Sequence, residues 1–284
     1  MIPKVIPELP ELELDGSGDP GEAGLSSPPP ELAVVCLPVA ERARVLSDLL
    51  RTGVDTLVMA PLAHSRAAAV AVSELAERLG RTLVTAAPMR RFTAARRARD
   101  LIGAGAIGAL DGVQIRLARK RTLAGCWQAN PLRSGGGIWI DRGPDALDLA
   151  EQLAGPIERV WIAVARSRQR TAVEDEVRVE LEHAGGVRST VELSWNDEAP
   201  EALVRCRGPH GELRIGHAQS VLVRAAERRV FAGSLSRHEI SRALLEDLLR
   251  RRACRDPEED HGEMTLGWIE AGYRSLRSGR WEIA

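Results

Sequence analysis

The chain has 284 residues, 44% of them hydrophobic, so it is long enough for one large or two ordinary domains with a substantial core. Its 39 Lys and Arg residues against 40 Asp and Glu give a formal net charge of -1, which argues against the one-sided basic field typical of nucleic-acid-binding proteins. Acidic stretches offset the basic clusters, so we expect these arginines to lie on solvated faces. The clusters are Arg90-Arg91, Arg96-Arg97 and Arg250-Arg251-Arg252.

Cysteine spacing and hydropathy predict a reduced protein without a membrane span. No Cys-x-x-Cys pair and no metal-ligand spacing occurs among Cys36, Cys126, Cys206 and Cys254. We therefore expect isolated thiols and no metal site. The N-terminus lacks the basic-then-apolar pattern of a signal peptide, and no apolar run approaches the length of a membrane span. A cytoplasmic protein is the expectation.

Residues 1–31 are rich in Pro, Gly and acidic residues and show no sustained apolar period. Proline removes a backbone donor and interrupts both helices and strands. We expect either an unstructured leader or an ordered arm, in which residues 5–14 are apolar enough to pack on a neighbour or a partner.

Three buried strands that alternate with two helices are predicted next. Apolar runs of this length are typical of strands buried on both faces, and strands that alternate with helices pair in parallel through right-handed crossovers. Gly53 and Gly80 stand where helix C-terminal caps belong. The strands are Leu32–Pro38, Val54–Met59 and Thr82–Ala86, and the helices are Glu41–Thr52 and Ser65–Leu79.

The remainder of the chain predicts a second, largely antiparallel sheet with flanking helices. A helix at 93–110 leads into a strand at Val113–Ala118, and Ala184-Gly185-Gly186 forms a hairpin turn. The further strands are expected at Arg159–Ala165, Glu176–His183, Val187–Trp195, Ala202–Arg207, Glu212–Ile215 and Ser220–Ala226, and the last two helices at Arg237–Arg252 and through Trp268 to Gly279.

The most informative run is 134–149, in which Gly135, Gly136 and Gly137 precede three aspartates. Residues three and four apart are neighbours on a helix, so Asp141, Asp145 and Asp148 would share one face. The glycines would let the backbone approach another group closely. Alternatively, Pro144 starts the helix as its first residue, which removes Asp141 from that face and leaves Asp145 and Asp148 as first-turn acids.

This run resembles a motif of the Gfo/Idh/MocA family of NAD(P)-dependent sugar and polyol oxidoreductases, in which a Gly-Gly turn precedes Asp-x-Gly-x-His-x-x-Asp. Asp141, Gly143 and Asp148 match, whereas the family's histidine, its usual catalytic acid/base, corresponds to Asp145. The family's catalytic lysine, in a strand end of the type Glu-Lys-Pro, corresponds to Ala60. A methyl group can neither transfer a proton nor carry a charge.

Other segments extend the resemblance over nearly all of 32–283. Leu101–Gly108 is similar to the family's linker helix and turn, Trp127 to a tryptophan before a substrate-facing loop, and 268–279 to its terminal helix. The resemblance implies an α/β + α+β fold: a partial, half Rossmann parallel sheet (32–90), then an open-faced, largely antiparallel sheet domain with flanking helices (91–284), after the arm at 1–31. It also implies an oligomer formed through the second sheet, either with a second copy or with a homologue.

A dinucleotide fold seats the pyrophosphate on a Gly-x-Gly-x-x-Gly turn between a strand and a helix. No turn with these neighbours precedes Leu32, and the glycines of Gly16-Ser17-Gly18 and of the Gly135 run have the wrong flanks. We therefore expect no cofactor, with NAD(P) only as the alternative.

Three functions remain open. The first is a non-catalytic relative that binds a sugar-like ligand or pairs with a full-length homologue. The second is a remodelled enzyme in which Asp141, Asp145, Asp148 and His64 form a general-base or metal-assisted site. The third is a sugar or polyol oxidoreductase whose cofactor site is unusual or supplied by another chain. The three differ most at Asp145.

Overall fold

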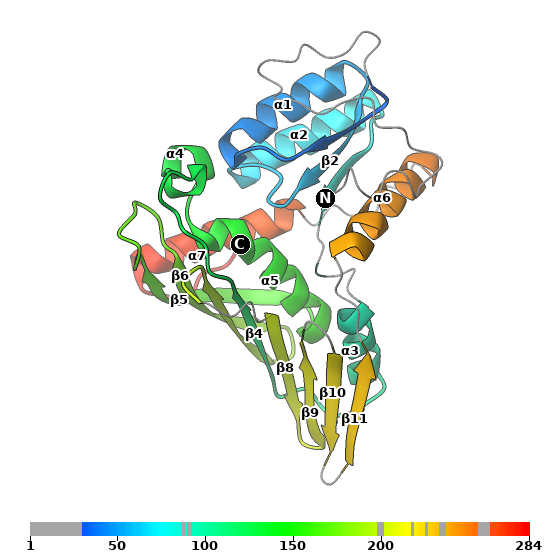
Figure 1. Ribbon diagram of the computed structural model, residues 1–284, viewed down its shortest axis with the longest axis vertical. Coiled ribbons are helices and arrows are strands. Elements are labelled where there is room, and N and C mark those ends of the chain that lie inside the picture. Colours follow the sequence, from blue (N-terminus) through cyan, green and yellow to red (C-terminus); the bar gives the residue numbers. More distant parts are fainter. Residues whose placement is uncertain are drawn as a thin grey trace. The chain divides into compact units, whose positions relative to one another are not determined.

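Figure 1 shows a computed structural model of the chain, which describes residues 30–86, 89, 93–197, 202–216, 219–224, 227–232, 237–254 and 262–284. By compactness the chain divides into two units, one made of residues 1–86 and 236–263 and the other of residues 87–235 and 264–284. The predicted arm at residues 1–31 lies outside the described residues except for Pro30 and Glu31.

The first unit contains the predicted parallel sheet. Its strands β1 (Leu32–Val35), β2 (Asp55–Met59) and β3 (Leu83–Ala86) pair in parallel in the order β1-β2-β3. Helices α1 (Val39–Arg51) and α2 (Arg66–Leu79) are the crossovers. The predicted caps are confirmed, because Gly53 and Gly80 both have positive φ after the helix ends.

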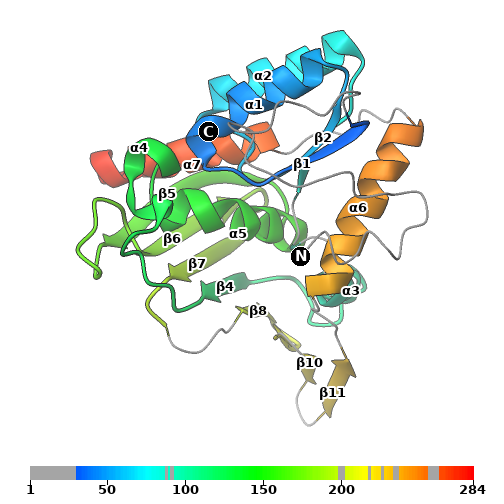
Figure 2. The same ribbon diagram turned by 45° about the horizontal axis from the view of Figure 1, so that its top comes forward.

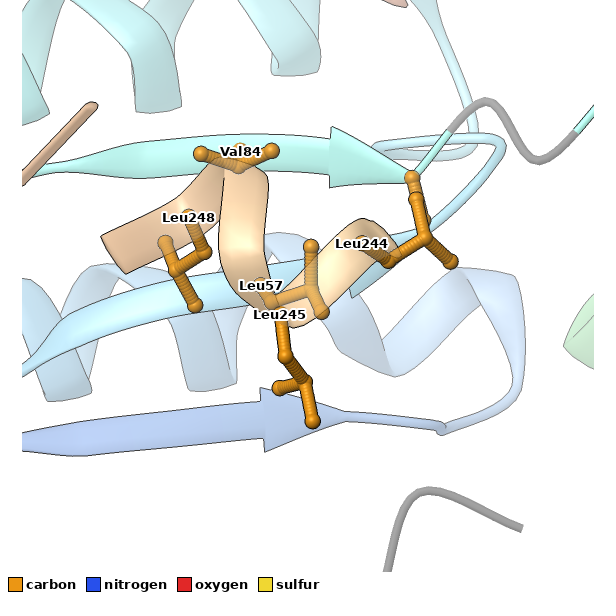
Figure 3. Packing of buried hydrophobic residues seen from close by; sticks show 6 residues of the cluster. Leu57, Val84, Leu244, Leu245 and Leu248 are labelled. Atoms are coloured by element: carbon orange, nitrogen blue, oxygen red, sulfur yellow. The ribbon is translucent and has the colours of Figure 1, made fainter. Parts of the chain in front are cut away.

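Helix α6 (Arg237–Cys254) packs on this sheet although it follows β3 by some 150 residues of sequence. Figure 3 shows Leu244, Leu245 and Leu248 of α6 against Leu57 and Val84, and all five side chains are buried. Successive residues of a strand point to opposite faces, so α6 covers the face that carries Leu57. The predicted boundary at residue 90 had assigned this helix to the second domain.

The second unit is built on the predicted larger sheet. Its eight strands have the order β11-β10-β9-β8-β4-β7-β6-β5, and all neighbours are antiparallel except β4 and β7, which are parallel. The strands are β4 (Gly112–Ala118), β5 (Ile157–Arg166), β6 (Glu176–His183), β7 (Arg188–Ser194), β8 (Ala202–Gly208), β9 (Gly211–Ile215), β10 (Gln219–Arg224) and β11 (Glu227–Ala232). Strand β11 was not predicted.

Helices α5 (Ile138–Ala154) and α3 (Thr93–Gly103) pack on the eight-stranded sheet. The other helical elements of this unit are a short 3-10 helix (Trp127–Ala129), α4 (Pro131–Ser134) and α7 (Gly262–Ser278). Helix α5 lies over β4, β6 and β7 (Figure 2). The strands alternate as predicted, because Val177, Val179 and Leu181 of β6 are buried on the inner face while Arg178 is exposed on the outer face.

Three of the four cysteines predicted to be isolated, Cys36, Cys126 and Cys206, are free thiols in the structure, and the side chain of Cys254 lies outside the described part of the chain. Among the described residues, no helix is both long and apolar enough to cross a membrane.

Candidate functional site

The end of β2 is the position at which the resemblance placed a catalytic lysine. The Ala60–Pro61 peptide bond is cis, and the chain then turns inward, since Leu62 and Ala63 are fully buried. Ser65 ends the turn by capping α2, where its hydroxyl accepts a hydrogen bond from Ala68 N at 3.2 Å. The turn is therefore well ordered, but Ala60 contributes only a methyl group.

The guanidinium of Arg42, from α1, holds the ends of β1 and β2 together. Its Nε donates to Leu37 O at 2.8 Å, and its Nη1 donates to Met59 O at 2.6 Å and to Pro61 O. Arg42 is itself buried. Three backbone carbonyls at the carboxyl edge of the sheet thus face a cation from the same chain, a role that sequence patterns did not reveal.

The described part of this edge does not fit a pyrophosphate. Helix α1 begins after Leu37-Pro38 and not after a glycine-rich turn, and Pro38, at its N-cap, has no amide N–H to donate. The expectation that no Gly-x-Gly-x-x-Gly pattern precedes Leu32 is wrong for the letters alone, because residues 16–21 read Gly-Ser-Gly-Asp-Pro-Gly. This run lies outside the described residues.

In the second unit, α5 is one continuous helix from Ile138 to Ala154, with Pro144 inside it. The alternative in which Pro144 starts the helix is therefore wrong. Asp141 N donates to Gly137 O at 3.2 Å, so the helical turn is already formed before the proline. Asp141 consequently stays on the face that carries the other two aspartates.

The three aspartates lie close enough to influence one another, as their spacing predicted. Asp145 is 6% exposed and pairs with Arg142 through an Nη1–Oδ2 contact of 2.7 Å, and Asp148 is 4% exposed and accepts from Gln152 Nε2 at 3.3 Å. Burial raises the pKa of Asp145; Arg142 opposes this shift, and the negative charges of Asp141 and Asp148 add to it.

The structure gives the glycine run a different purpose from ligand binding. A Cβ atom on Gly136 would overlap the Tyr273 hydroxyl, and one on Gly137 would overlap the backbone of Glu174. The close approach that the glycines permit is thus made by the chain itself.

Glu174 closes the N-terminus of α5. Its carboxylate accepts hydrogen bonds from Gly137 N and Trp139 N, both at 3.1 Å, and from the Tyr273 hydroxyl at 2.9 Å. Burial raises the pKa of Glu174, and these three donors oppose the shift. Tyr273, within the segment 268–279 that resembles the family's terminal helix, therefore has a structural role. Glu174 lies 37 residues from Gly137, and no local sequence signal indicated it.

Trp127 lies in the short 3-10 helix that precedes α4. It is half-buried, and the next residue, Gln128, is buried. Asn130 caps α4, since its Oδ1 accepts from Leu132 N at 3.0 Å. The segment is ordered, but its contacts do not assign Trp127 to a ligand.

His64 and the three aspartates belong to different units of the chain. His64 lies in the turn after β2, and its side chain is exposed. Throughout the described ranges, no group of three His, Cys, Asp or Glu side chains is arranged to hold a metal ion. The described residues therefore give no support to the metal-assisted form of the remodelled site.

Comparisons with known proteins give one family match, which lies within the second unit. Residues 95–214 match the family model of the GFO/IDH/MocA C-terminal domain. No curated protein sequence matches the chain. This family match agrees with the predicted resemblance over that part of the chain.

Solved structures show the same fold over most of the chain. An aldose-aldose oxidoreductase from Caulobacter crescentus, complexed with glycerol, has a TM-score of 0.80 at 22% identity over 89% of this chain and 79% of its own. A levoglucosan dehydrogenase in complex with NADH and levoglucosan has a TM-score of 0.79 at 17% identity over 89% and 80%. An inositol dehydrogenase homologue from Azotobacter vinelandii, complexed with NAD+, has a TM-score of 0.77 at 17% identity over 89% and 78%. The predicted fold class is confirmed.

Proposed function

We propose that this chain is a GFO/IDH/MocA-like protein that binds a sugar- or polyol-like ligand or a partner chain and does not use the lysine and histidine chemistry implied by the resemblance. The observation that carries this proposal is the end of β2. There the backbone turn is ordered and tied to Arg42, yet the side chain at the lysine position is Ala60. Proton transfer at this position would need an ionisable group.

Asp145 is a poor substitute for a histidine base in this proposal, because its ionised form pairs with Arg142 at 2.7 Å and a paired carboxylate is a weaker base. A histidine, by contrast, titrates near neutral pH and can both accept and donate a proton. Two positions of one proton-transfer system are thus altered together.

Ligands seen in structures of similar fold support the proposed ligand class. The solved relatives are an aldose-aldose oxidoreductase with glycerol, a levoglucosan dehydrogenase with levoglucosan and an oxidoreductase from Agrobacterium radiobacter with L-tartaric acid. All three ligands are small and hydroxyl-rich. We expect this chain to take a ligand of the same class.

Calorimetric titration tests the proposal. We expect saturable heats with one or more members of a panel of polyols and aldoses, and no NAD(P)H production or consumption when the same compounds are supplied with NAD+ or NADP+. NAD(P)H turnover by the parent chain would overturn the non-catalytic proposal. Loss of that turnover in Asp145→Asn would assign it to this carboxyl, and its survival in Asp145→Asn would place the chemistry elsewhere.

A second candidate is an oxidoreductase in which Asp145 acts as a general acid. A buried carboxyl with a raised pKa is suited to that role, as in other enzymes that tune an acid by burial. Structural relatives in complexes with NAD+ and NADH support the use of such a cofactor. Tight, saturable quenching or enhancement of NADH fluorescence by the purified chain would favour this candidate.

We also propose that the chain associates with a second copy or a homologue through the outer face of its eight-stranded sheet, near β5. Trp161 and Trp281 lie with ring centroids 5.9 Å apart, and the Arg159 guanidinium lies 5.6 Å from the Trp281 ring. Both tryptophans are only half-buried. Trp and Arg dominate the energetics of protein interfaces.

Light scattering coupled to gel filtration tests this contact. We expect a dimer mass for the parent chain and a shift toward the monomer for Trp161→Ala. The control is Leu132→Ala, since Leu132 is 85% exposed on α4 and lies outside the sheet. A monomeric parent chain, or an unchanged dimer in Trp161→Ala, would count against this surface.

A further inference from the structure

A cluster of arginines lies on the outer face of the sheet on the central strands β8 and β9, which β4, β7 and β6 separate from β5 and its tryptophan. In the strand register, Arg205 of β8 is directly opposite Gln114 of β4 on one side and Arg214 of β9 on the other. Arg207, two residues along β8, is opposite Glu212. Side chains that face each other in this way have Cβ atoms about 5 Å apart and share one face of the sheet.

Among the described residues, one carboxylate pairs with this cluster. Glu212 accepts a hydrogen bond from Arg207 Nε at 3.3 Å and another from Arg214 Nε. Arg205 is not part of this pairing. With three guanidiniums and one carboxylate, the cluster has a net charge of +2. Like charges directly opposite each other weaken a sheet, so the arrangement is unfavourable unless an anion joins it.

The side chain of Arg205 itself points to a missing acceptor. Its Nε is buried and has no hydrogen-bond partner within the part of the chain that the structure describes. A buried charged donor that stays unpaired is costly, more so than a neutral one. Arg205 as a whole is half-buried, so the outer end of its guanidinium can meet a bound group. Arg207 and Arg214 are 55% and 50% exposed and can reorient.

The strand next to Arg207 leaves room beside the cluster. Gly112 of β4 is opposite Arg207 and carries no side chain on this face. Gln114, the neighbour of Arg205, is exposed and can donate or accept through its amide. The surface around Arg205 is therefore polar, basic and open on the β4 side.

We propose that Arg205, Arg207 and Arg214, with Gln114, bind the phosphate group of a small phosphorylated molecule. The planar fork of a guanidinium matches the oxygens of a phosphate, and two or more arginines on one surface neutralise its double charge. This site is separate from the candidate site at Ala60 and Asp145 and does not depend on the function proposed for it.

A control arginine is available on the same face. Arg178 of β6 is 52% exposed and already pairs with Glu180, at 3.1 Å, and with Glu192, at 3.8 Å. Its replacement by glutamine removes one positive charge from the face without touching the cluster. A specific site and a general basic field are thereby distinguished.

Calorimetric titration at low ionic strength with inorganic phosphate, with glycerol 3-phosphate and with glycerol tests the proposal. We expect the parent chain to bind both phosphate compounds saturably and not to bind glycerol. Phosphate binding should be at least tenfold weaker in Arg205→Gln and in Arg214→Gln, and should change less than twofold in Arg178→Gln. Absence of saturable binding to the parent chain, or an equal loss in Arg178→Gln, overturns the site.

Thermal unfolding supplies a readout that a purely structural arginine would not give. Without phosphate, Arg205→Gln should raise Tm by about 1–3 °C because it relieves the repulsion from Arg214. With saturating phosphate, the parent chain should gain Tm and Arg205→Gln should not. The gain in the parent chain would be missing if the site did not exist.

The acceptor could also be a carboxylate of a second copy. Light scattering separates the two acceptors, because a small-molecule site leaves the mass of Arg205→Gln equal to that of the parent chain. A loss of mass in Arg205→Gln would assign the arginines to a contact between copies and overturn the small-molecule site.

Discussion

Gly272 of α7 lies directly against the indole ring of Trp139 of α5. A Cβ atom at Gly272 would lie 2.5 Å from Trp139 Nε1, which donates to Ile269 O at 3.0 Å. On the other helix, a Cβ atom at Gly143 would lie 2.6 Å from Ile269 Cδ1 and 2.8 Å from the same indole ring. The two glycines therefore set how closely α5 and α7 approach, around a fully buried tryptophan.

Gly143→Ala should destabilise the chain although alanine favours helices. The helix propensity gain is about 1 kcal/mol, but the added methyl group forces Trp139 or Ile269 to move, and such overpacking costs about 1–3 kcal/mol. We expect a net loss, measured as a lower urea midpoint. The matched control is Gly103→Ala at the end of α3, where nothing lies within 4 Å of the added Cβ atom. Equal midpoints for the two variants would contradict this account.

The glycines also show where sequence reasoning reached its limit. The motif at 135–148 correctly predicted a helix with three neighbouring aspartates, because helical spacing is a local property. The groups that the glycines approach, Glu174 and Tyr273, come from distant segments. Only the tertiary structure brings them together, so the sequence could indicate a close approach without naming its partner.

The buried guanidinium of Arg42 should be specific for arginine. Arg42→Lys keeps the charge, but a single ammonium cannot reach the carbonyls of Leu37, Met59 and Pro61 in the planar geometry of the fork. With one or more charge-assisted hydrogen bonds lost, we expect a decrease of about 2 kcal/mol in the free energy of unfolding.

The control for Arg42 lies on the same helix. Arg44 is 70% exposed and pairs with Asp48 at 3.5 Å, so Arg44→Lys should change stability by no more than about 0.5 kcal/mol. Both values come from urea unfolding followed by circular dichroism. Similar losses in the two variants would show that Arg42 acts only as a charge.

Periodicity predicted the strands of both sheets except β11, together with their long helices, since alternation and apolar runs are properties of neighbouring residues. It did not predict the parallel pairing of β4 with β7 or the packing of α6 on β1–β3. Both join segments far apart in sequence. The pattern of Leu244, Leu245 and Leu248 indicates a helix with an apolar face, and several faces could receive it.

Leu248→Ala tests the packing of α6. Leu248 is fully buried against the sheet, so its truncation should cost about 2–5 kcal/mol. Leu79→Ala on α2, where the side chain is 41% exposed, should cost much less. If α6 packed on the sheet only loosely, the two variants would unfold at the same urea concentration.

The pH dependence of the free energy of unfolding tests whether Asp145 is buried as the structure has it. Burial raises its pKa in the folded chain above the ordinary value of 3.8. The folded state therefore holds this proton more tightly than the unfolded state, and the resulting stabilisation is complete below pH 3.8 and is lost as pH rises through the raised pKa.

Asp145→Asn cannot ionise and should escape that loss. The stability of the variant relative to the parent chain should therefore increase from about pH 3.5 upward and level off above the raised pKa, by about 1.4 kcal/mol for each unit of the shift. Glu174, whose pKa is also raised by burial, is present in both chains and cancels in the comparison. Urea unfolding at each whole pH value from 3 to 8 gives the curve. A difference that falls with rising pH would mean that the Arg142 ion pair outweighs burial, which would return Asp145 to the role of an ordinary paired carboxylate.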